Sequence, residues 1–202
     1  GIDISNCRLS KILKKNSSKI YTDLDIFYSF YKNKSFTITG TNGKSTTAKI
    51  LHKVLVDQKY DARLIGNIGN PVLSEKKITK KTVFVIEASS YQLDYSKVFT
   101  SKYAVILNIS PDHLERHKNL KNYVNAKFKL LTSQPSKSIA FVKKNDPLIN
   151  EIINKKNFKQ KIIKVDSLKN DKMLKQLKNK YFLSFGNKEN LSFILKISKT
   201  LK

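Results

Sequence analysis

Residues 35–57 read SFTITGTNGKSTTAKILHKVLVD. The first five residues, 35–39, have the β-branched and aromatic composition of a buried strand. From residue 44 to residue 57, apolar side chains recur at helical spacing on one face: Ala48, Leu51, Val54 and Leu55. Two glycines, Gly40 and Gly43, lie in the turn between these segments. A strand, a glycine-containing turn and a helix in this order are typical of a phosphate-binding loop.

The residues of this turn have the chemistry to bind phosphate. Glycines let backbone N–H groups approach phosphate oxygens, and the start of the helix adds positive potential. Lys44 would add a mobile charge at the β and γ phosphates, and Ser45 would place its hydroxyl on magnesium. Ile38 stands where the usual G-x-x-x-x-G-K-[ST] pattern has its first glycine, so we expect a shortened loop. The alternative is a plain glycine turn without a ligand.

Other segments of the chain alternate between strand and helix patterns. A second helical pattern covers residues 120–131, with Tyr123, Val124, Lys127 and Leu131 on one face. Further strand candidates are residues 82–88, 103–109 and 138–142 and, more weakly, 62–65, 161–165 and 181–185. This alternation predicts an α/β fold with a mostly parallel sheet covered by helices on both faces. Ligands of such sheets bind beyond the carboxyl ends of the strands, so residues directly after strands are the site candidates.

Composition and charge narrow the class of function. The chain has 202 residues, and 40 Lys and Arg against 15 Asp and Glu give a formal net charge of +25. Only three of these basic residues are Arg, the side chain best suited to reading bases, so we attribute the charge to genomic composition and expect no nucleic-acid partner. The longest apolar run, residues 103–107, is far shorter than the roughly 20 residues of a membrane span. With one cysteine and no signal-peptide pattern, we expect a cytoplasmic protein.

Two further strand ends carry ionisable residues. Glu87 follows the apolar run 83–86, where a carboxylate can hold magnesium beside a triphosphate; a helix cap or a solvated glutamate is the alternative. Asp112 and His113 follow the strand candidate 103–109. His113 has the chemistry of a metal ligand, with Asp112 orienting its neighbours, and an ordinary polar surface turn fits the sequence equally well.

Lys127 occupies a position where the helical pattern calls for an apolar side chain. Either its stem is buried while its ammonium reaches water, or the lysine has a function. The other two histidines, His52 and His117, have no such context, and we interpret them as solvated residues.

Five segments, in order along the chain, resemble the central ATPase domain of the Mur ligase family. They are TGTNGKST at 39–46, GNIG at 66–69, EASSYQLD at 87–94, LNISPDHLERH at 107–117 and YVNAK at 123–127. The resemblance covers about residues 31–202. We expect residues 1–30 to be the tail and linker of a UDP-binding N-terminal domain, the family's C-terminal domain to be absent, and the chain to be a fragment.

The resemblance implies roles for individual residues. ATP would be bound by Gly40, Thr41, Asn42, Gly43, Lys44, Ser45 and Thr46. Lys44, Glu87, His113 and Lys127 would serve catalysis, with Ser45 and Glu87 holding a first magnesium ion and His113 and Lys127 a second. Lys127 would be carbamylated by carbon dioxide and so become a carboxylate-like ligand. Asn67 and Ser89 would face the UDP-linked substrate. Asn187 and Asn190 fit the adenine-contacting H-N-x-x-N segment, although Gly186 replaces its histidine.

The implied activity is ATP-dependent amide formation in peptidoglycan precursor synthesis, through an acyl phosphate. The SSYQL and GNIG segments favour family members that add D-glutamate to UDP-N-acetylmuramoyl-L-alanine, acting as monomers. Another Mur-type ligase or a folylpolyglutamate synthase is the alternative within enzymes. A nucleotide- or nucleic-acid-binding module without ligase activity is the alternative of another class. We expect the isolated chain to keep the nucleotide-binding fold without completing ligation.

Overall fold

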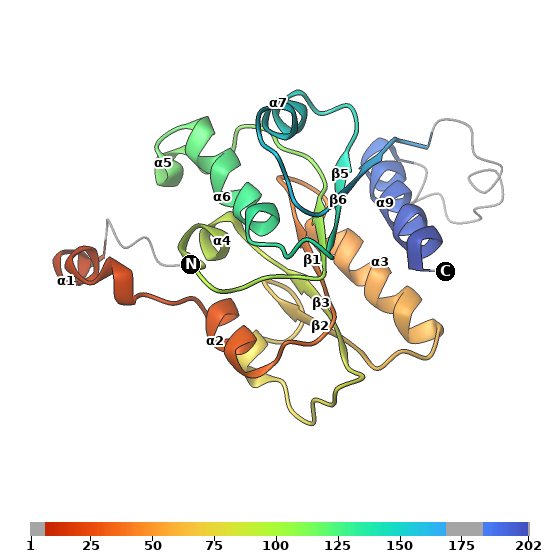
Figure 1. Ribbon diagram of the computed structural model, residues 1–202, viewed down its shortest axis with the longest axis horizontal. Coiled ribbons are helices and arrows are strands. Elements are labelled where there is room, and N and C mark those ends of the chain that lie inside the picture. The colour runs from red at the N-terminus through yellow and green to blue at the C-terminus, as the bar shows by residue number, and fades with distance from the viewer. Residues whose placement is uncertain (1–6, 169–183, 202) are drawn as a thin grey trace.

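The computed structural model describes residues 7–168 and 184–201. Six parallel strands form one sheet in the order β2-β3-β1-β4-β5-β6 (Figure 1). Their bounds are Ser35–Thr39 for β1, Ala62–Gly66 for β2, Val83–Glu87 for β3, Tyr103–Ile106 for β4, Ile139–Lys143 for β5 and Lys161–Val165 for β6. Because β1 lies between β3 and β4, the loop after β1 leaves the sheet near its centre, where the chain crosses from one half of the sheet to the other.

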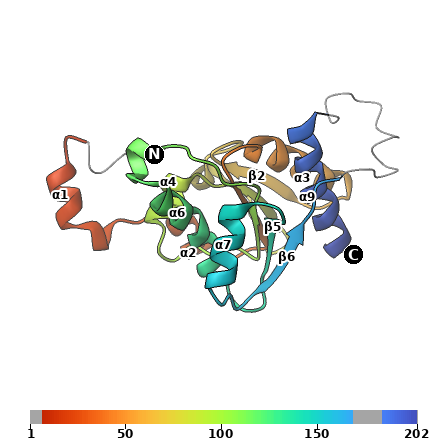
Figure 2. The same ribbon diagram turned by 90° about the horizontal axis from the view of Figure 1, so that it is seen from above.

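Helices cover both faces of this sheet (Figure 2). One face carries α3 (Lys44–Asp57) and α9 (Phe185–Leu201), and the other carries α2 (Asp23–Phe30), α4 (Ser90–Tyr95), α6 (Leu120–Thr132) and α7 (Pro147–Lys155). The short helices are α1 (Ser10–Lys15) and α5 (Leu114–His117), with 3-10 turns at Ser17–Lys19 and Val72–Ser74. Neighbouring strand residues point into opposite cores, so Ile106 packs with α6 while Val105 packs with α3. Burial on both faces explains why β3 and β4 are nearly continuous apolar runs, while β1 buries the small polar side chains of Ser35, Thr37 and Thr39.

The predicted α/β class is confirmed, and β1, β6 and α3 have the predicted bounds. β4 ends at Ile106 rather than at residue 109, because the chain then turns toward the loop after β1. Of the weak strand candidate 181–185, residues 181–183 lie outside the described residues, and Phe185 begins α9. None of the described helices is long and apolar enough to cross a membrane.

Helix α2 shares the core of this domain. A capping box begins the helix, and Leu24 and Phe27 are buried with the sheet. The Asp25 carboxylate is fully buried and accepts hydrogen bonds from the backbone N–H groups of residues 97–99. Burial opposes its ionisation, but the hydrogen bonds outweigh this effect and keep the pKa of Asp25 below its usual value. The end of the segment expected as an N-terminal tail therefore packs as part of the central domain.

Candidate nucleotide-binding site

The loop of residues 40–43 leaves the carboxyl end of β1 and leads directly into α3 (Figure 1). Gly43 caps α3 in a left-handed conformation, with φ of 83°. A Cβ at this position would lie 2.3 Å from Oδ1 of Asn190, so both the backbone and the contact with α9 require glycine. A loop that ends in a helix N-terminus directs backbone N–H groups toward an anion, which is the geometry that the phosphate-binding hypothesis needs.

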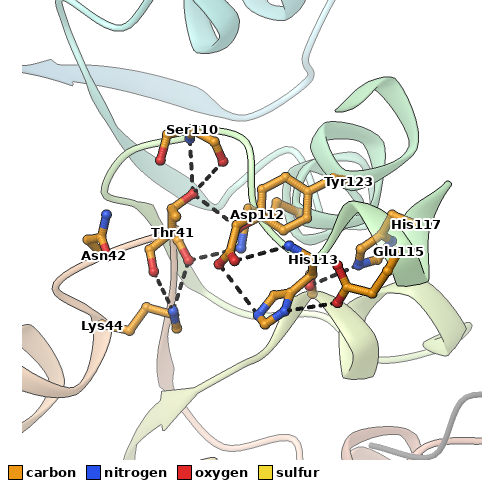
Figure 3. Close-up of polar contacts among 12 residues, drawn as sticks. Thr41, Asn42, Lys44, Ser110, Asp112, His113, Glu115, His117 and Tyr123 are labelled. Carbon is orange, nitrogen blue, oxygen red and sulfur yellow. Dashed lines mark hydrogen bonds and ion pairs between the residues drawn. The ribbon is translucent and has the colours of Figure 1, made fainter. Parts of the chain in front are cut away.

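Asn108 holds the loop in this shape. Its Oδ1 accepts hydrogen bonds from the N–H groups of Asn42 at 2.8 Å and Thr41 at 3.1 Å, and its Nδ2 donates to the Asn42 carbonyl at 3.1 Å. The Thr41 hydroxyl lies 3.0 Å from the Tyr123 hydroxyl and accepts a hydrogen bond from the Ser110 N–H at 3.0 Å (Figure 3). Asn108 was not predicted as a site residue, although a polar residue soon after a buried strand was a signal for it. Residues from outside the loop therefore fix its conformation.

Lys44 begins α3 and folds back over the loop (Figure 3). Its Nζ donates to the carbonyls of Gly40 at 3.0 Å and Thr41 at 2.8 Å. Ser45 and Thr46 follow in the first turn of the helix, whose N–H groups have no partner inside a helix. An ammonium beside these N–H groups creates a positive field suited to phosphate oxygens.

Glu87 ends β3, beside β1 in the sheet, and is only 1% exposed. Its Oε1 accepts a hydrogen bond from Nδ2 of Asn67 at 3.0 Å. Its Oε2 is buried and has no hydrogen-bond partner among the described residues. A buried carboxylate oxygen is costly unless a cation or a donor meets it, so this oxygen fits a bound magnesium ion. Both alternative roles for Glu87 are wrong. Its side chain is buried rather than solvated, and the residue that caps α4 is Ser89, not Glu87.

Lys127 projects from α6 toward the loop and is 2% exposed. Its Nζ donates to the Gly40 carbonyl at 2.9 Å and lies 4.4 Å from the centroid of the Tyr123 ring. Burial and then the charge of Lys44 lower the pKa of Lys127 from 10.5 to about 7, against the opposing effect of Asp112. A substantial share of this amine is therefore uncharged near neutral pH. The alternative that its ammonium reaches water is wrong, because the ammonium is buried against the loop.

His113 stands at the rim of the same site (Figure 3). Its backbone is left-handed, with φ of 52°, and its ring lies between two carboxylates. Nε2 is 3.4 Å from Oδ2 of Asp112, and Nδ1 is 3.8 Å from Oε1 of Glu115. Among the residues that the structure describes, no group of three or more His, Cys, Asp or Glu side chains gathers as a metal site. An ion beside His113 would therefore need other ligands, such as phosphate oxygens or a modified lysine.

The prediction that His117 is solvated is wrong. His117 is 4% exposed, its Nε2 lies 3.0 Å from Oγ of Ser90, and its ring packs against Tyr91 and Tyr123. Burial lowers the pKa of His117 and so favours the neutral ring. The half-buried His52 donates from Nε2 to the carbonyl of the first β2 residue at 3.2 Å. The following helix, α6, and the more distant α4 together bury His117, and the contribution of α4 could not be read from the local pattern.

A cavity of about 560 Å³ opens beside the loop, between the ends of β4 and β5 and the start of α9. Gly43 and Thr46 line it on the loop side, and Asn187 and Asn190 line it on α9. Asn190 is 6% exposed, and its Nδ2 lies 3.5 Å from Oδ1 of Asn187. The structure thus brings the predicted adenine-contacting residues next to the predicted phosphate-binding residues, although the two sets are far apart in sequence.

Asn67 and Ser89 follow β2 and β3 at the same end of the sheet. Asn67 donates its side-chain amide to Glu87. Oγ of Ser89 accepts a hydrogen bond from the Gln92 N–H at 3.2 Å and caps α4. Both residues therefore position neighbouring groups, and their contact with a UDP-linked substrate stays a prediction.

Comparison with known proteins identifies the family of this chain. Residues 38–198 match the family model of the Mur ligase middle domain. The chain is 39% identical over 162 residues to a UDP-N-acetylmuramoylalanine–D-glutamate ligase of Rickettsia bellii (strain RML369-C). The aligned residues make up 80% of this chain and 35% of the relative. A ligase of the same name from Bartonella henselae is 43% identical over 109 residues, or 54% of this chain and 23% of the relative. The chain thus spans about a third or less of the length of these relatives.

Solved structures of low sequence identity share the fold. A UDP-N-acetylmuramate:L-alanyl-gamma-D-glutamyl-meso-diaminopimelate ligase from Neisseria meningitides matches with a TM-score of 0.55 and 17% identity, over 69% of this chain and 50% of that chain. A MurF ligase from Thermotoga maritima, solved in complex with ADP, matches with a TM-score of 0.50 and 14% identity, over 75% of this chain and 36% of that chain. Since the family model covers most of the sequence and these folds agree, the chain belongs to the Mur ligase family.

Proposed function

We propose that this chain is the ATP-binding centre of a ligase that joins D-glutamate to UDP-N-acetylmuramoyl-L-alanine, a step of peptidoglycan precursor synthesis. The names of the similar ligases support the choice of reaction. The observation that carries the proposal is that the ammonium groups of Lys44 and Lys127 both donate to the Gly40 carbonyl. A phosphate-binding lysine and a buried amine thus share one loop. Because the chain spans about a third of its relatives, we assign ligation to the longer protein and nucleotide binding to this chain.

We assign two magnesium ions to the proposed site. Ser45 and Glu87 would hold the first, and the unpartnered buried Oε2 of Glu87 supports this assignment. His113 and Lys127 would hold the second once Lys127 carries a carboxylate. When bound, magnesium supplies positive charge that neutralises the triphosphate.

Lys127 is suited to become that carboxylate. A neutral amine adds to carbon dioxide, so that an N–C bond forms, one proton is released and the product is a carbamate. The lowered pKa of Lys127, about 7, supports the proposal because it makes the neutral amine available near physiological pH. The carbamate would then be a hard oxygen ligand, which magnesium prefers.

In the proposed reaction, the substrate carboxylate attacks the γ phosphorus of ATP, the bond to the bridging oxygen breaks, and an acyl phosphate and ADP form. Lys44 and the first N–H groups of α3 would stabilise the charge on the phosphate oxygens. The amine of D-glutamate then attacks the acyl carbon and phosphate leaves, while Asn67 and Ser89 would contact the UDP-linked substrate. We expect the protein to act as a monomer in the cytoplasm, which supplies both ATP and the UDP-linked substrate.

Calorimetry of ATP binding with and without magnesium tests this proposal. Magnesium should strengthen ATP binding to the wild-type chain, and Glu87→Gln should reduce that gain by about 10-fold or more, because it removes a charged ligand. Glu151→Gln, on the exposed side of α7, is the matched control and should bind as the wild type does. Absence of magnesium-dependent binding in a folded wild-type chain would contradict the proposal. In the longer protein, ATP consumption should require both UDP-N-acetylmuramoyl-L-alanine and D-glutamate, and use of a different acceptor would favour another ligase of the family.

A further inference from the structure

A partly buried ion pair joins β5 to α9 at the edge of the cavity. Nζ of Lys143, the last residue of β5, lies 2.5 Å from Oε1 of Glu189 in α9. The side chains are 22% and 12% exposed, respectively, and both residues line the cavity. Oε1 of Glu189 also accepts a hydrogen bond from the Ser167 hydroxyl at 3.4 Å. The carboxylate is therefore held from the ends of two strands, β5 and β6.

Glu189 has neighbours in α9 that face the phosphate-binding loop. Asn190, the next residue, packs so closely on Gly43 that a Cβ there would lie 2.3 Å from its Oδ1. Asn187, two residues earlier, lines the same cavity. A shift of α9 along or around its axis would therefore move both asparagines relative to the loop.

Apolar packing alone does not fix that placement closely. Phe193, Ile194 and Ile197 bury the later turns of α9 against α3 and the sheet, and such contacts are not directional. A charge pair with a short N–O distance is directional, and its loss would leave one charge in a partly buried place. The Leu168 N–H also donates to Oγ of Ser192 in α9 at 3.1 Å. The pair of Lys143 with Glu189 adds a charged, directional contact at the first turns of the helix.

We propose that the Lys143–Glu189 ion pair is a positioning element that seats the start of α9 on the phosphate-binding loop and thereby sets how tightly the chain holds the base and sugar end of its nucleotide. The inference rests on the proposed function, because it assumes that the cavity holds a nucleotide. It assigns the pair a role in binding the nucleoside and none in binding the phosphates.

Binding of two ligands by the 202-residue chain tests the inference: ADP, which fills both parts of the site, and inorganic tripolyphosphate, which has no base. Both titrations are done by calorimetry at one fixed ionic strength, because the chain is strongly basic. Lys143→Met and Glu189→Gln should each weaken ADP binding by about 10-fold and change tripolyphosphate binding less than about 2-fold. The double variant should bind ADP as tightly as the single variant with the lower ADP affinity, because either change alone already breaks the ion pair.

A neighbouring pair supplies the control. Nζ of Lys144 lies 2.9 Å from Oδ2 of Asp166, and these side chains are 53% and 47% exposed. Lys144→Met removes the same charge one residue along the chain and should leave the affinities for both ligands unchanged.

Several outcomes would overturn the inference. One is an unchanged ADP affinity in folded Lys143→Met. Another is a double variant whose fold-loss of ADP affinity equals the product of the fold-losses in the two single variants. A purely structural pair would lower the unfolding temperature without changing the ratio of the ADP and tripolyphosphate affinities, which would also count against it. If the folded wild-type chain binds neither ligand, the proposed function fails first, and the inference fails with it.

Discussion

In the proposed nucleotide site, the phosphate side is residues 40–46, which come from one stretch of sequence. The proposed base side is assembled from β5 and α9 and consists of Lys143, Asn187, Glu189 and Asn190. On the phosphate side the backbone provides most of the binding groups, and glycine conformation and the helix start determine its shape. On the base side, side chains provide the binding groups, and the ion pair of Lys143 with Glu189 holds the helix that carries them. We therefore expect loss of the charged group on the phosphate side to weaken nucleotide binding more than loss of a single side chain on the base side.

Lys44→Ala should have the largest effect, because it removes the mobile charge from the loop. We expect ATP and tripolyphosphate both to bind about 100-fold more weakly, and ligation by the longer protein to fall by about 1000-fold. Calorimetry and a phosphate-release assay measure the two effects. Lys53→Ala is the control on the same helix, since that side chain is 76% exposed and pairs with Asp57. Wild-type affinity in Lys44→Ala would mean that Lys44 is not part of a phosphate site.

Lys127→Ala, in α6 beside the loop, should separate the chemical step from nucleotide binding. We expect turnover by the longer protein to fall by about 100-fold while ADP affinity stays within about 2-fold, because the proposed carbamate serves the reaction and not the nucleotide. Small carboxylic acids should restore part of the activity in this variant and none in Lys44→Ala.

The pH dependence of the wild type tests the same residue. The pKa of Lys127 is lowered to about 7, so its amine is mainly protonated below that pH and mainly neutral above it. At a fixed concentration of dissolved carbon dioxide, turnover should therefore rise as pH increases from about 6 to 8. Lys121→Ala, an exposed change on the same helix, should keep the wild-type profile. Full activity of Lys127→Ala, or a flat profile in the wild type, would remove Lys127 from the reaction.

The same contrast explains which site residues the sequence could predict. Glu87 was predictable because it directly follows an apolar strand whose carboxyl end had to face the ligand. Asn108 and His117 were missed because their partners come from other elements. Asn108 accepts hydrogen bonds from backbone amides of the loop, and His117 pairs with Ser90 of α4. The pairing of Lys143 with Glu189 was beyond prediction, since in a chain so rich in lysine no local pattern distinguishes this one.

The fold shows the same division. Residues 35–39 and 44–57 were predicted with correct bounds, because a run of β-branched and aromatic residues and a long helical period are strong local signals. Helices α4 and α7 went unnoticed because they are short, although Ser89 with Gln92 and Asp146 with Pro147 are helix-start signals that the structure uses.

Gly43→Ala tests the point where the two sides meet. The new Cβ would lie 2.3 Å from Oδ1 of Asn190, and φ of 83° disfavours any residue other than glycine. We expect a loss of about 1–3 kcal/mol in the free energy of unfolding, measured with urea, and about 10-fold weaker ADP binding, because Asn190 has to move away from the loop. Gly186→Ala is the control for stability, since a Cβ there meets nothing within 4 Å. Unchanged stability and ADP affinity in Gly43→Ala would show that the loop can shift away from α9 without cost, so that the phosphate side and the base side would be independent structures rather than two halves of one site.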